Sequence, residues 1–565
     1  MNELDSAKNK HKSAFLSKIY RNPIFILTII TVGITAYLLE VQMKIGVPYW
    51  DVFNYLNNAL FFAGMGKGSV LYLPPVIPFL TSLFFKAGYI SINAIFILDS
   101  ILFITGVIGL YLLLNQRFNG IQSLTGSLIF ISFPVVMSWA SAGGIDLPGV
   151  SFSIWAIYLT VLGVKKNPKY LYFVIPLMML AFLTRYTAGL IILPVLFYAI
   201  INIKQIQKIK KVITGILLEL IVLISGFLYV YMHLGTITSF YSLLANVLTS
   251  TSKGLGDVAY NPNYWYYLQN IPNYISLAPF NGTYQQLLNP SAGFPSLLAY
   301  LIILIAVVGL IFYIYKILDL KFKNKVNLQD KYSITKVTVL VILIIGIILT
   351  FNSTQYLLSE IFFFGACFLL YNLLKSSETK NIELDIMMFL WFGTYLIFQS
   401  TLGVKVDRYF ITMAPALAYF IILGLSEFIN KIKPKIRNKS LKSWGIYAII
   451  ALIFLSSATV TYIGHTPKKT FTKDIGDASN WIKGYDPDYK NKIIYSDYPP
   501  AVSWYLKKGI NGGFPRFYKN PDDFAKVLQS KKADYYIDSL SEPKLNLKGY
   551  QIIKNFGNVA VYKRT

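Results

Sequence analysis

The sequence predicts a polytopic α-helical membrane protein with about thirteen transmembrane helices and a small C-terminal α/β domain. Three observations lead to this fold class. Of the 565 residues, 55% are hydrophobic and only 14% are charged. Apolar runs of about twenty residues, the length that a helix needs to cross a bilayer, recur through most of the chain. From about residue 466 the composition changes to that of a soluble domain.

We expect a transmembrane helix wherever an apolar run is long enough to cross the hydrocarbon core. The segment 73–88 is also apolar, but prolines at its start interrupt it, so we place it in the first external loop as a re-entrant or interfacial segment. The expected spans are residues 24–42, 92–114, 121–139, 148–164, 169–183, 186–203, 212–233, 297–316, 337–351, 358–375, 386–402, 410–429 and 444–464.

The positive charges predict the orientation of the chain. Basic residues precede the first span, which has no small-residue cleavage site and therefore reads as a retained signal anchor with a cytoplasmic N-terminus. Lysine-rich stretches lie in the alternate loops that this orientation places in the cytoplasm, and an odd number of spans puts the C-terminus outside the cell. The basic residues that predict this orientation are Lys8, Lys10, Lys12, Lys18 and Arg21 before the first span, and the loop clusters near residues 165–169, 204–211, 321–325 and 431–442.

Two domains are expected. Residues 1–465 form a transmembrane domain with external loops at 43–91 and 234–296, and residues 466–565 form a soluble extracytoplasmic domain. Within the second, helix-like and strand-like patterns alternate, which is typical of an α/β fold. The helix-like stretches are 474–483 and 520–531, and the strand-like runs are 492–495, 534–538, 549–554 and 558–563.

Composition excludes several function classes. The net charge of +26 comes from lysines in short loops between spans, where they set topology, so a nucleic-acid partner is not expected. With a single cysteine, Cys367, and three histidines, neither an intramolecular disulfide nor a Cys or His metal centre is expected. No internal repeat of the kind found in many secondary transporters is visible.

Carboxylates are few near the expected outer face, so each is a candidate for acid–base chemistry. Asp51 follows Tyr49 and Trp50 just beyond the first span. Partial burial there keeps a base desolvated and reactive, whereas the alternative is an N-cap for a helix that begins near Val52; the two roles are compatible.

Two further acids are candidates: Asp146, also near the outer face and between the third and fourth spans, and Asp99. Asp146, two residues before Pro148, matches an N-cap with proline in the first turn, and a functional role is the second interpretation. Asp99 lies inside the second span, where an ionisable residue is costly; it is either functional or a helix-packing partner. The run Asp486-Pro487-Asp488 mimics a metal-binding Asp-x-Asp pair, but its polar setting favours a turn.

Three cations on the expected outer side could hold an anionic group: Arg185, Lys405 and Arg408. Arginine is suited to phosphate because its fixed donors bind two oxygens at once. The alternatives are snorkelling of Arg185 to lipid headgroups, and an Asp407–Arg408 ion pair or interface anchoring. Arg408 with Tyr409 is the stronger functional candidate of that cluster.

Four short matches, in order along the chain, resemble the GT-C superfamily of glycosyltransferases, in particular the dolichyl-phosphate-mannose protein mannosyltransferases and the lipid A aminoarabinose transferase. The resemblance covers most of the chain, although Leu73 replaces the cation that often begins the second motif. The matching segments are Asp51 in the first external loop, Tyr72-Leu73-Pro74-Pro75-Val76, Gly144-Ile145-Asp146 with Leu183-Thr184-Arg185-Tyr186, and Asp407-Arg408-Tyr409-Phe410 with Pro415.

The resemblance implies a multi-pass cell-membrane enzyme that moves a single sugar, with inversion, from a polyprenyl-phosphate donor to a protein, lipid or glycan acceptor of the cell envelope, outside the membrane. Protein glycosylation is one such process. No cofactor is implied, and nothing requires a metal. The implied roles are Asp51 and Asp146 as catalytic residues, Arg185, Arg408 and Lys405 as ligands of the donor phosphate, and Tyr49, Trp50, Tyr186, Tyr409, Tyr264 and Trp265 as substrate-binding residues.

Two other classes remain open from the sequence. A transporter or flippase of lipid-linked glycans would use intramembrane charges to line a pathway, and it would show repeated halves without needing an external domain. A structural or sensor protein would use the C-terminal domain to bind a surface polymer. An oligosaccharyltransferase is disfavoured because the C-terminal domain has no Trp-Trp-Asp-Tyr-Gly motif.

Overall fold

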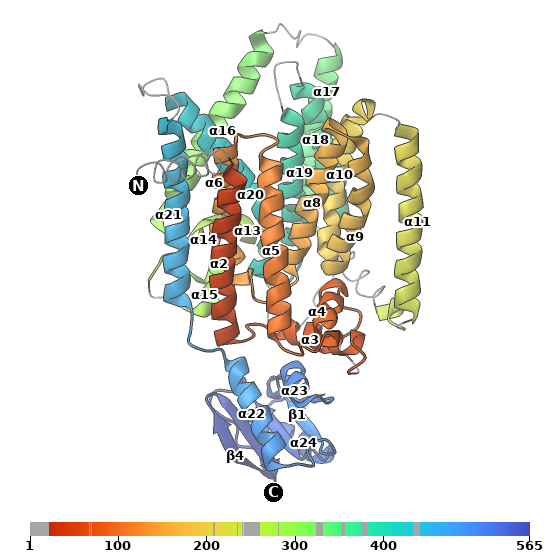
Figure 1. Cartoon of the computed structure of the whole chain (residues 1–565), viewed down its shortest axis with the longest axis vertical. Coiled ribbons are helices and arrows are strands. Elements are labelled where there is room, and N and C mark those ends of the chain that lie inside the picture. Colours follow the sequence, from red (N-terminus) through yellow and green to blue (C-terminus); the bar gives the residue numbers. More distant parts are fainter. Residues whose placement is uncertain are drawn as a thin grey trace, which may run out of the picture. The chain divides into compact units, whose positions relative to one another are not determined.

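The structure is a computed structural model of the whole chain (Figure 1). The basic N-terminal segment, most of the loop 234–259 and the lysine-rich stretch 433–440 lie outside the described residues, so the expected orientation of the termini stays a prediction. The residues described are 22–66, 68, 70–206, 209–233, 235–239, 241, 260–280, 282–323, 331–351, 356–375, 381–432 and 441–565.

The chain divides into two compact units that do not follow the expected domain boundary. The first unit comprises Met1–Ala36, Ile101–Ala140 and Ile145–Thr466, and the second comprises Tyr37–Ser100, Ser141–Gly144 and Pro467–Thr565. The division therefore falls inside the helices α2 (Pro23–Ile45) and α5 (Asn93–Leu114). The expected boundary at residues 465 and 466 remains a sequence prediction, but the C-terminal residues share a compact unit with the first expected external loop.

The first unit is a bundle of long helices with short helical segments between them (Figure 1). Its elements are α6 (Gly120–Ser132), α7 (Pro134–Trp139), α8 (Asp146–Lys165), η1 (Pro168–Phe173), α9 (Val174–Thr184), η2 (Tyr186–Ile191), α10 (Ile192–Ile201), η3 (Ile203–Gln205), α11 (Ile209–His233), α13 (Tyr266–Gln269), α14 (Ile271–Ile275), α15 (Tyr284–Leu288), η6 (Pro290–Ala292), α16 (Leu297–Lys323), α17 (Lys331–Phe351), α18 (Tyr356–Leu374), α19 (Ile382–Thr401), η7 (Asp407–Thr412), α20 (Ala414–Ile432) and α21 (Leu441–His465).

The helical membrane fold expected from the sequence is confirmed. Within the described ranges, 10 helices are long and apolar enough to cross a membrane, and four shorter apolar helices accompany them. Every expected span contains a helix, but 121–139 is divided at Phe133 because a residue before proline is driven out of the helical conformation, here to ψ 127°. The number of crossings, about thirteen, stays a prediction since several of these helices are short.

Small residues bring the bundle helices close together. Gly309 of α16 lies against the backbone of Gly424 in α20, and a Cβ atom at either position would collide with the other helix. Such small-residue contacts drive helix association in membranes, where burial of apolar surface contributes little. The same bundle packs α8 against α9 and α10 against α19.

The second unit contains two short helices, α3 (Trp50–Phe62) and α4 (Val76–Lys86), and a C-terminal domain built on a five-stranded sheet. The strands are β1 (Ile494–Ser496), β2 (Asn511–Gly512), β3 (Tyr535–Asp538), β4 (Tyr550–Phe556) and β5 (Val559–Arg564), in the order β2-β1-β3-β5-β4. β1 pairs in parallel with β2 and β3, and β5 is antiparallel to β3 and β4.

Three α-helices and one short 3-10 helix accompany this sheet: α22 (Phe471–Tyr485), α23 (Pro499–Leu506), η9 (Pro515–Phe517) and α24 (Pro521–Ser530). Both helix-like stretches and all four strand-like runs expected here are present, whereas α23 and β2 were missed because each is too short for a periodic pattern. Phe524 and Leu528 of α24 pack on Tyr536 of β3 and Tyr562 of β5 to form the domain core.

The helix α3 packs directly on the C-terminal domain within this unit. The Asn57 side-chain amide donates a hydrogen bond of 3.0 Å to the Pro500 carbonyl. The Phe53 ring lies 6.3 Å from Tyr498 and 5.8 Å from Tyr505. Aromatic contacts at these separations stabilise packing beyond area burial. The segment that carries Asp51 is therefore supported by residues more than 400 positions later in the chain.

Candidate active site

A buried ion pair joins two of the predicted site residues in the first unit. Asp146 is the first residue of α8, and Arg185 lies between the end of α9 and the start of η2. Arg185 Nη1 pairs with Asp146 Oδ1, and the two side chains are only 7% and 1% exposed. Arg185 Nε also donates to Thr187 Oγ1 at 2.7 Å. The pair is costly to bury but strongly held once formed, because removing either partner leaves a bare charge inside.

Two arginines share one tyrosine ring beside this pair. The Cζ atom of Arg185 lies 4.7 Å from the centroid of the Tyr409 ring, and that of Arg408 lies 5.9 Å from it. Arg408 also lies over Trp139, 5.7 Å from the ring centroid. Cation–π contacts hold the guanidinium groups in place, and their mutual repulsion favours an anion between them. We call Asp146, Arg185, Arg408 and Tyr409 the guanidinium cluster.

Asp407, next to Arg408, fastens the segment after Tyr260 to η7. The hydroxyl groups of Tyr266 and Tyr274 donate to its Oδ1 at 2.5 and 2.8 Å, and the Ser291 amide donates to its Oδ2 at 2.7 Å. Burial, with Asp407 nearby, raises the pKa of both tyrosines, so they remain donors at neutral pH. Sequence reasoning missed this role; the dense tyrosines of that segment were the available signal.

Lys405 has contacts typical of a helix cap. Its Nζ donates to the carbonyls of Ser400 at 2.7 Å and Gln399 at 3.3 Å, and also to Leu402, at the end of α19. Burial lowers its pKa to about 8. These contacts satisfy carbonyls that the helix leaves open. Its predicted role as a phosphate ligand stays a prediction.

The remaining aromatic candidates lie at several places in the first unit. The Tyr186 ring lies 5.3 Å from Phe182, and Tyr264 lies over Lys405, 5.9 Å from its Nζ. Trp265 packs 5.6 Å from Phe351 and is 51% exposed. These contacts join Tyr264 to Lys405, whereas Trp265 packs against Phe351 of α17. Their roles as substrate-binding residues stay predictions.

Asp51 lies in the second unit, in the first turn of α3. The helix begins at Trp50 and its N-cap is Tyr49, so the alternative in which Asp51 caps a helix starting near Val52 is wrong. A carboxylate in the first turn still interacts favourably with the helix dipole. Asp146 likewise lies inside its helix, since Ile145 is the N-cap of α8.

The neighbours of Asp51 come from the C-terminal domain. The Trp50 ring meets Tyr498 edge-on at 4.5 Å and Phe514 at 6.3 Å. Burial raises the pKa of Tyr498, and the nearby Tyr49, Asp51 and Asp497 raise it further. This second group therefore combines acidic and phenolic side chains on an aromatic support.

Asp99, a candidate from the sequence, is hydrogen-bonded within the second unit. Asp99 Oδ2 accepts a hydrogen bond of 2.9 Å from the Gly143 amide, and Gly143 has φ +80°, a conformation that glycine adopts without strain. The helix-packing interpretation of Asp99 is therefore supported. Within the described ranges, no three His, Cys, Asp or Glu side chains are placed to hold a metal ion.

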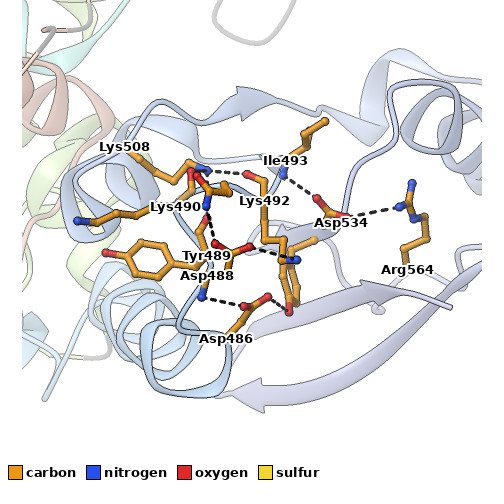
Figure 2. Close-up of polar contacts among 11 residues, drawn as sticks. Asp486, Asp488, Tyr489, Lys490, Lys492, Ile493, Lys508, Asp534 and Arg564 are labelled. Atoms are coloured by element: carbon orange, nitrogen blue, oxygen red, sulfur yellow. Dashed lines mark hydrogen bonds and ion pairs between the residues drawn. The ribbon is translucent and has the colours of Figure 1, made fainter.

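The Asp486-Pro487-Asp488 run is a hydrogen-bonded turn (Figure 2). Asp486 accepts from Tyr535 at 2.8 Å and from the Asp488 amide at 3.1 Å, and Asp488 pairs with Lys492 at 3.6 Å. Lys508 donates to three carbonyls of the same turn, those of Tyr489, Lys490 and Lys492. The turn interpretation is confirmed.

Solved structures show which fold this chain shares. The chain aligns with ArnT from Cupriavidus metallidurans bound to undecaprenyl phosphate at a TM-score of 0.55 and 11% identity, covering 94% of this chain and 97% of that one. It aligns with the oligosaccharyltransferase of Archaeoglobus fulgidus at a TM-score of 0.51 and 12% identity, covering 91% and 69%. The protein is thus a multi-pass membrane protein with the GT-C fold.

A narrower resemblance comes from the sequence. Residues 73–229 match the family model for dolichyl-phosphate-mannose-protein mannosyltransferases, a range that contains both Asp146 and Arg185. No curated protein sequence matches the chain. The expected resemblance to GT-C glycosyltransferases of the mannosyltransferase and ArnT type is confirmed.

Proposed function

We propose that this protein is a membrane glycosyltransferase that moves a single sugar from a polyprenyl-phosphate donor to a protein, lipid or glycan acceptor on the outer side of the cell membrane. The guanidinium cluster is the observation that carries this proposal. Arg185 and Arg408 lie on one tyrosine ring within the range of cation–π attraction. The family match and the undecaprenyl phosphate bound to ArnT, which shares the fold, support the same donor chemistry.

The guanidinium cluster acts on the leaving group. As the bond between the anomeric carbon and the phosphate oxygen breaks, polyprenyl phosphate leaves with the electron pair and gains negative charge. Fixed guanidinium groups in a site with little water stabilise that charge without reorganising. Asp146 holds Arg185 in place through the buried ion pair. In this scheme it also contacts the sugar or the acceptor.

Asp51 acts on the acceptor. Its carboxylate accepts the proton of the attacking hydroxyl while that oxygen bonds to the anomeric carbon on the face opposite the phosphate. One displacement of this kind inverts the configuration of the sugar. No metal is needed in this scheme, since the arginines stabilise the departing phosphate. The scheme places the C-terminal domain outside the cell and the N-terminus in the cytoplasm, in agreement with the lysine distribution.

The test is transfer by the purified full-length protein from radiolabelled polyprenyl-phosphate sugars to membrane extracts. We expect Asp51→Asn to lower transfer by about 10²–10⁴-fold, the usual contribution of a general base. Glu40→Gln is the matched control: Glu40 is an exposed carboxylate at the end of the first span, paired with Lys44. The configuration at the anomeric carbon of the product tests inversion.

The same experiment separates the enzyme from a flippase. A flippase moves the intact donor across a liposome bilayer and releases no polyprenyl phosphate. If the wild type moves the intact donor and transfers no sugar, the proposed function is wrong. If the wild type transfers sugar and Asp51→Asn transfers it equally well, the proposed role of Asp51 is wrong.

A further inference from the structure

The C-terminal domain contains a pocket of about 310 Å³ that the scheme above does not use. Its lining comes from the segments that follow the three parallel strands. Asp497 follows β1, Phe514 and Arg516 follow β2, and Leu540 and Ser541 follow β3. Ligand sites in open α/β sheets lie at the carboxyl ends of the strands, where consecutive connections leave in opposite directions. In the order β2-β1-β3 that position is between β1 and β3.

A buried carboxylate fixes the wall of this pocket. Asp497 is 1% exposed and accepts hydrogen bonds from the Ser539 amide at 3.0 Å, the Ser539 hydroxyl at 2.6 Å and the Leu540 amide at 2.7 Å. These bonds tie the segment after β3 to the end of β1. The pocket wall is therefore preformed, which lowers the entropic cost of binding.

Arg516, which lines the pocket, lies beside two aromatic rings, of which Phe514 also lines the pocket. The Cζ atom of Arg516 lies 5.8 Å from the Phe514 ring centroid and 5.1 Å from that of Phe517, which is 69% exposed. Aromatic faces pack on the C–H face of a sugar ring, and arginine binds carboxylate or phosphate oxygens in pairs. Together these groups favour a sugar that carries an anionic substituent.

The pocket adjoins the segment of Asp51 within the second unit. Phe514, which lines the pocket, lies 6.3 Å from the Trp50 ring, and Tyr498, the neighbour of Asp497, lies 4.5 Å from it. Trp50 directly precedes Asp51 in α3. A molecule held at Arg516 is therefore close to the acid that the proposed reaction assigns to the acceptor.

We infer that this pocket binds the acceptor, a saccharide carrying a carboxylate or phosphate group, and presents its hydroxyl to Asp51. The inference rests on the proposed function for the role of Asp51, but the binding site itself does not. An extended peptide fits less well, because the edge strand beside the pocket, β2, has only two residues to pair with an added strand. The volume is also at the lower end of the roughly 300–1,000 Å³ of ligand pockets.

The binding test uses the full-length protein in detergent, without donor, and glucuronate, glucose 1-phosphate, glucose and inorganic phosphate as probes in titration calorimetry. We expect the two anionic sugars to bind more tightly than glucose or phosphate alone, and Arg516→Gln to weaken them by about tenfold or more. Lys519→Gln is the matched control, an exposed cation of the same segment that does not line the pocket. Equal binding by Arg516→Gln, or preference for a peptide, overturns the inference.

The kinetic test separates this inference from the proposed function. With wild-type transfer established, Arg516→Gln should raise the KM for an anionic saccharide acceptor by about tenfold and leave the KM for the donor unchanged, because the cation contacts only the acceptor. An unchanged acceptor KM overturns the acceptor site and leaves the transferase standing. Arg516-dependent binding without any transfer by the wild type overturns the transferase and the acceptor role together, but leaves a saccharide site.

Discussion

Buried carboxylates have different partners in the two units of the molecule. In the helix bundle, Asp146 is neutralised by Arg185, and Asp407 receives hydrogen bonds from two tyrosines and one amide. In the C-terminal domain, Asp497 and Asp538 lie near one another, and the nearest cation of Asp538 is Lys544 at 3.9 Å. The bundle thus gives its buried carboxylates an ion pair or hydrogen-bond donors, whereas the domain places two buried acids near one another, and burial raises the pKa of Asp497 to about 7.

Removing Arg185 gives the largest expected effect. Arg185→Gln leaves the Asp146 carboxylate buried without its cation, which costs about 3–5 kcal/mol of stability, and transfer is lost with it. The double variant Arg185→Gln with Asp146→Asn should recover much of the stability, measured by thermal unfolding in detergent, but not the transfer. Full recovery of activity in the double variant would show that the pair is only structural.

Arg408→Gln should lower kcat/KM for sugar transfer by about 10²–10³-fold with little loss of stability, the usual effect of removing one group that stabilises a developing charge. Arg408→Lys keeps the positive charge but loses the fork of donors, so its kcat/KM should lie between that of the wild type and that of Arg408→Gln. Arg564→Gln is the control, since Arg564 is a surface residue that pairs with Asp534 at 3.4 Å (Figure 2). Transfer within twofold of the wild type contradicts the role of Arg408.

The stability of the C-terminal domain should depend on pH through Asp497. Burial raises its pKa to about 7, and the nearby Asp538 adds to the effect. The folded state therefore keeps a proton that the unfolded state releases at its lower pKa, so stability is greatest below that lower value and falls as the pH rises to about 7.

Hydrogen exchange of residues 494–541 in the full-length protein, from pH 5 to pH 8, measures this dependence. Asp497→Asn should flatten it, and Asp538→Asn should weaken it because one neighbouring charge is lost. A dependence that is the same in Asp497→Asn assigns it to another group.

The smallest effect is expected at the turn of Figure 2. The Asp488–Lys492 pair is largely exposed, with side chains 57% and 35% accessible. Such pairs contribute about 0–1 kcal/mol, so Asp488→Asn should change stability by less than that and leave transfer unchanged with or without added divalent metal. A metal-dependent loss of activity would restore the metal-site interpretation that the hydrogen bonds argue against.

Local patterns predicted the positions of the helices well. Every expected span contains a helix, because the length of an apolar run is a local property of the sequence and decides whether the segment can cross a bilayer. Pro134 shows the limit: it divides one expected span, and the sequence alone did not reveal how the two pieces would pack. The short α23 and β2 were missed because a few residues carry no measurable period.

The candidate residues were named from the sequence, but their partners were not. Arg185 and Arg408 were recognised as cations in apolar surroundings, whereas the Tyr409 ring that joins them could be identified only in three dimensions. Asp407 was noted for its charge, and its three donors come from a segment more than a hundred residues earlier in the chain.

The sequence by itself determined that the protein is a multi-pass membrane protein with a C-terminal α/β domain, and it supplied the acids and arginines of the candidate site. Tertiary structure decided which of these groups meet: Asp146 with Arg185, both arginines with Tyr409, and the helix of Asp51 with the C-terminal domain. The reason is physical. Hydrophobic burial is not directional and depends on local composition, whereas ion pairs, hydrogen bonds and ring contacts act over a few ångströms and exist only where packing brings distant segments together.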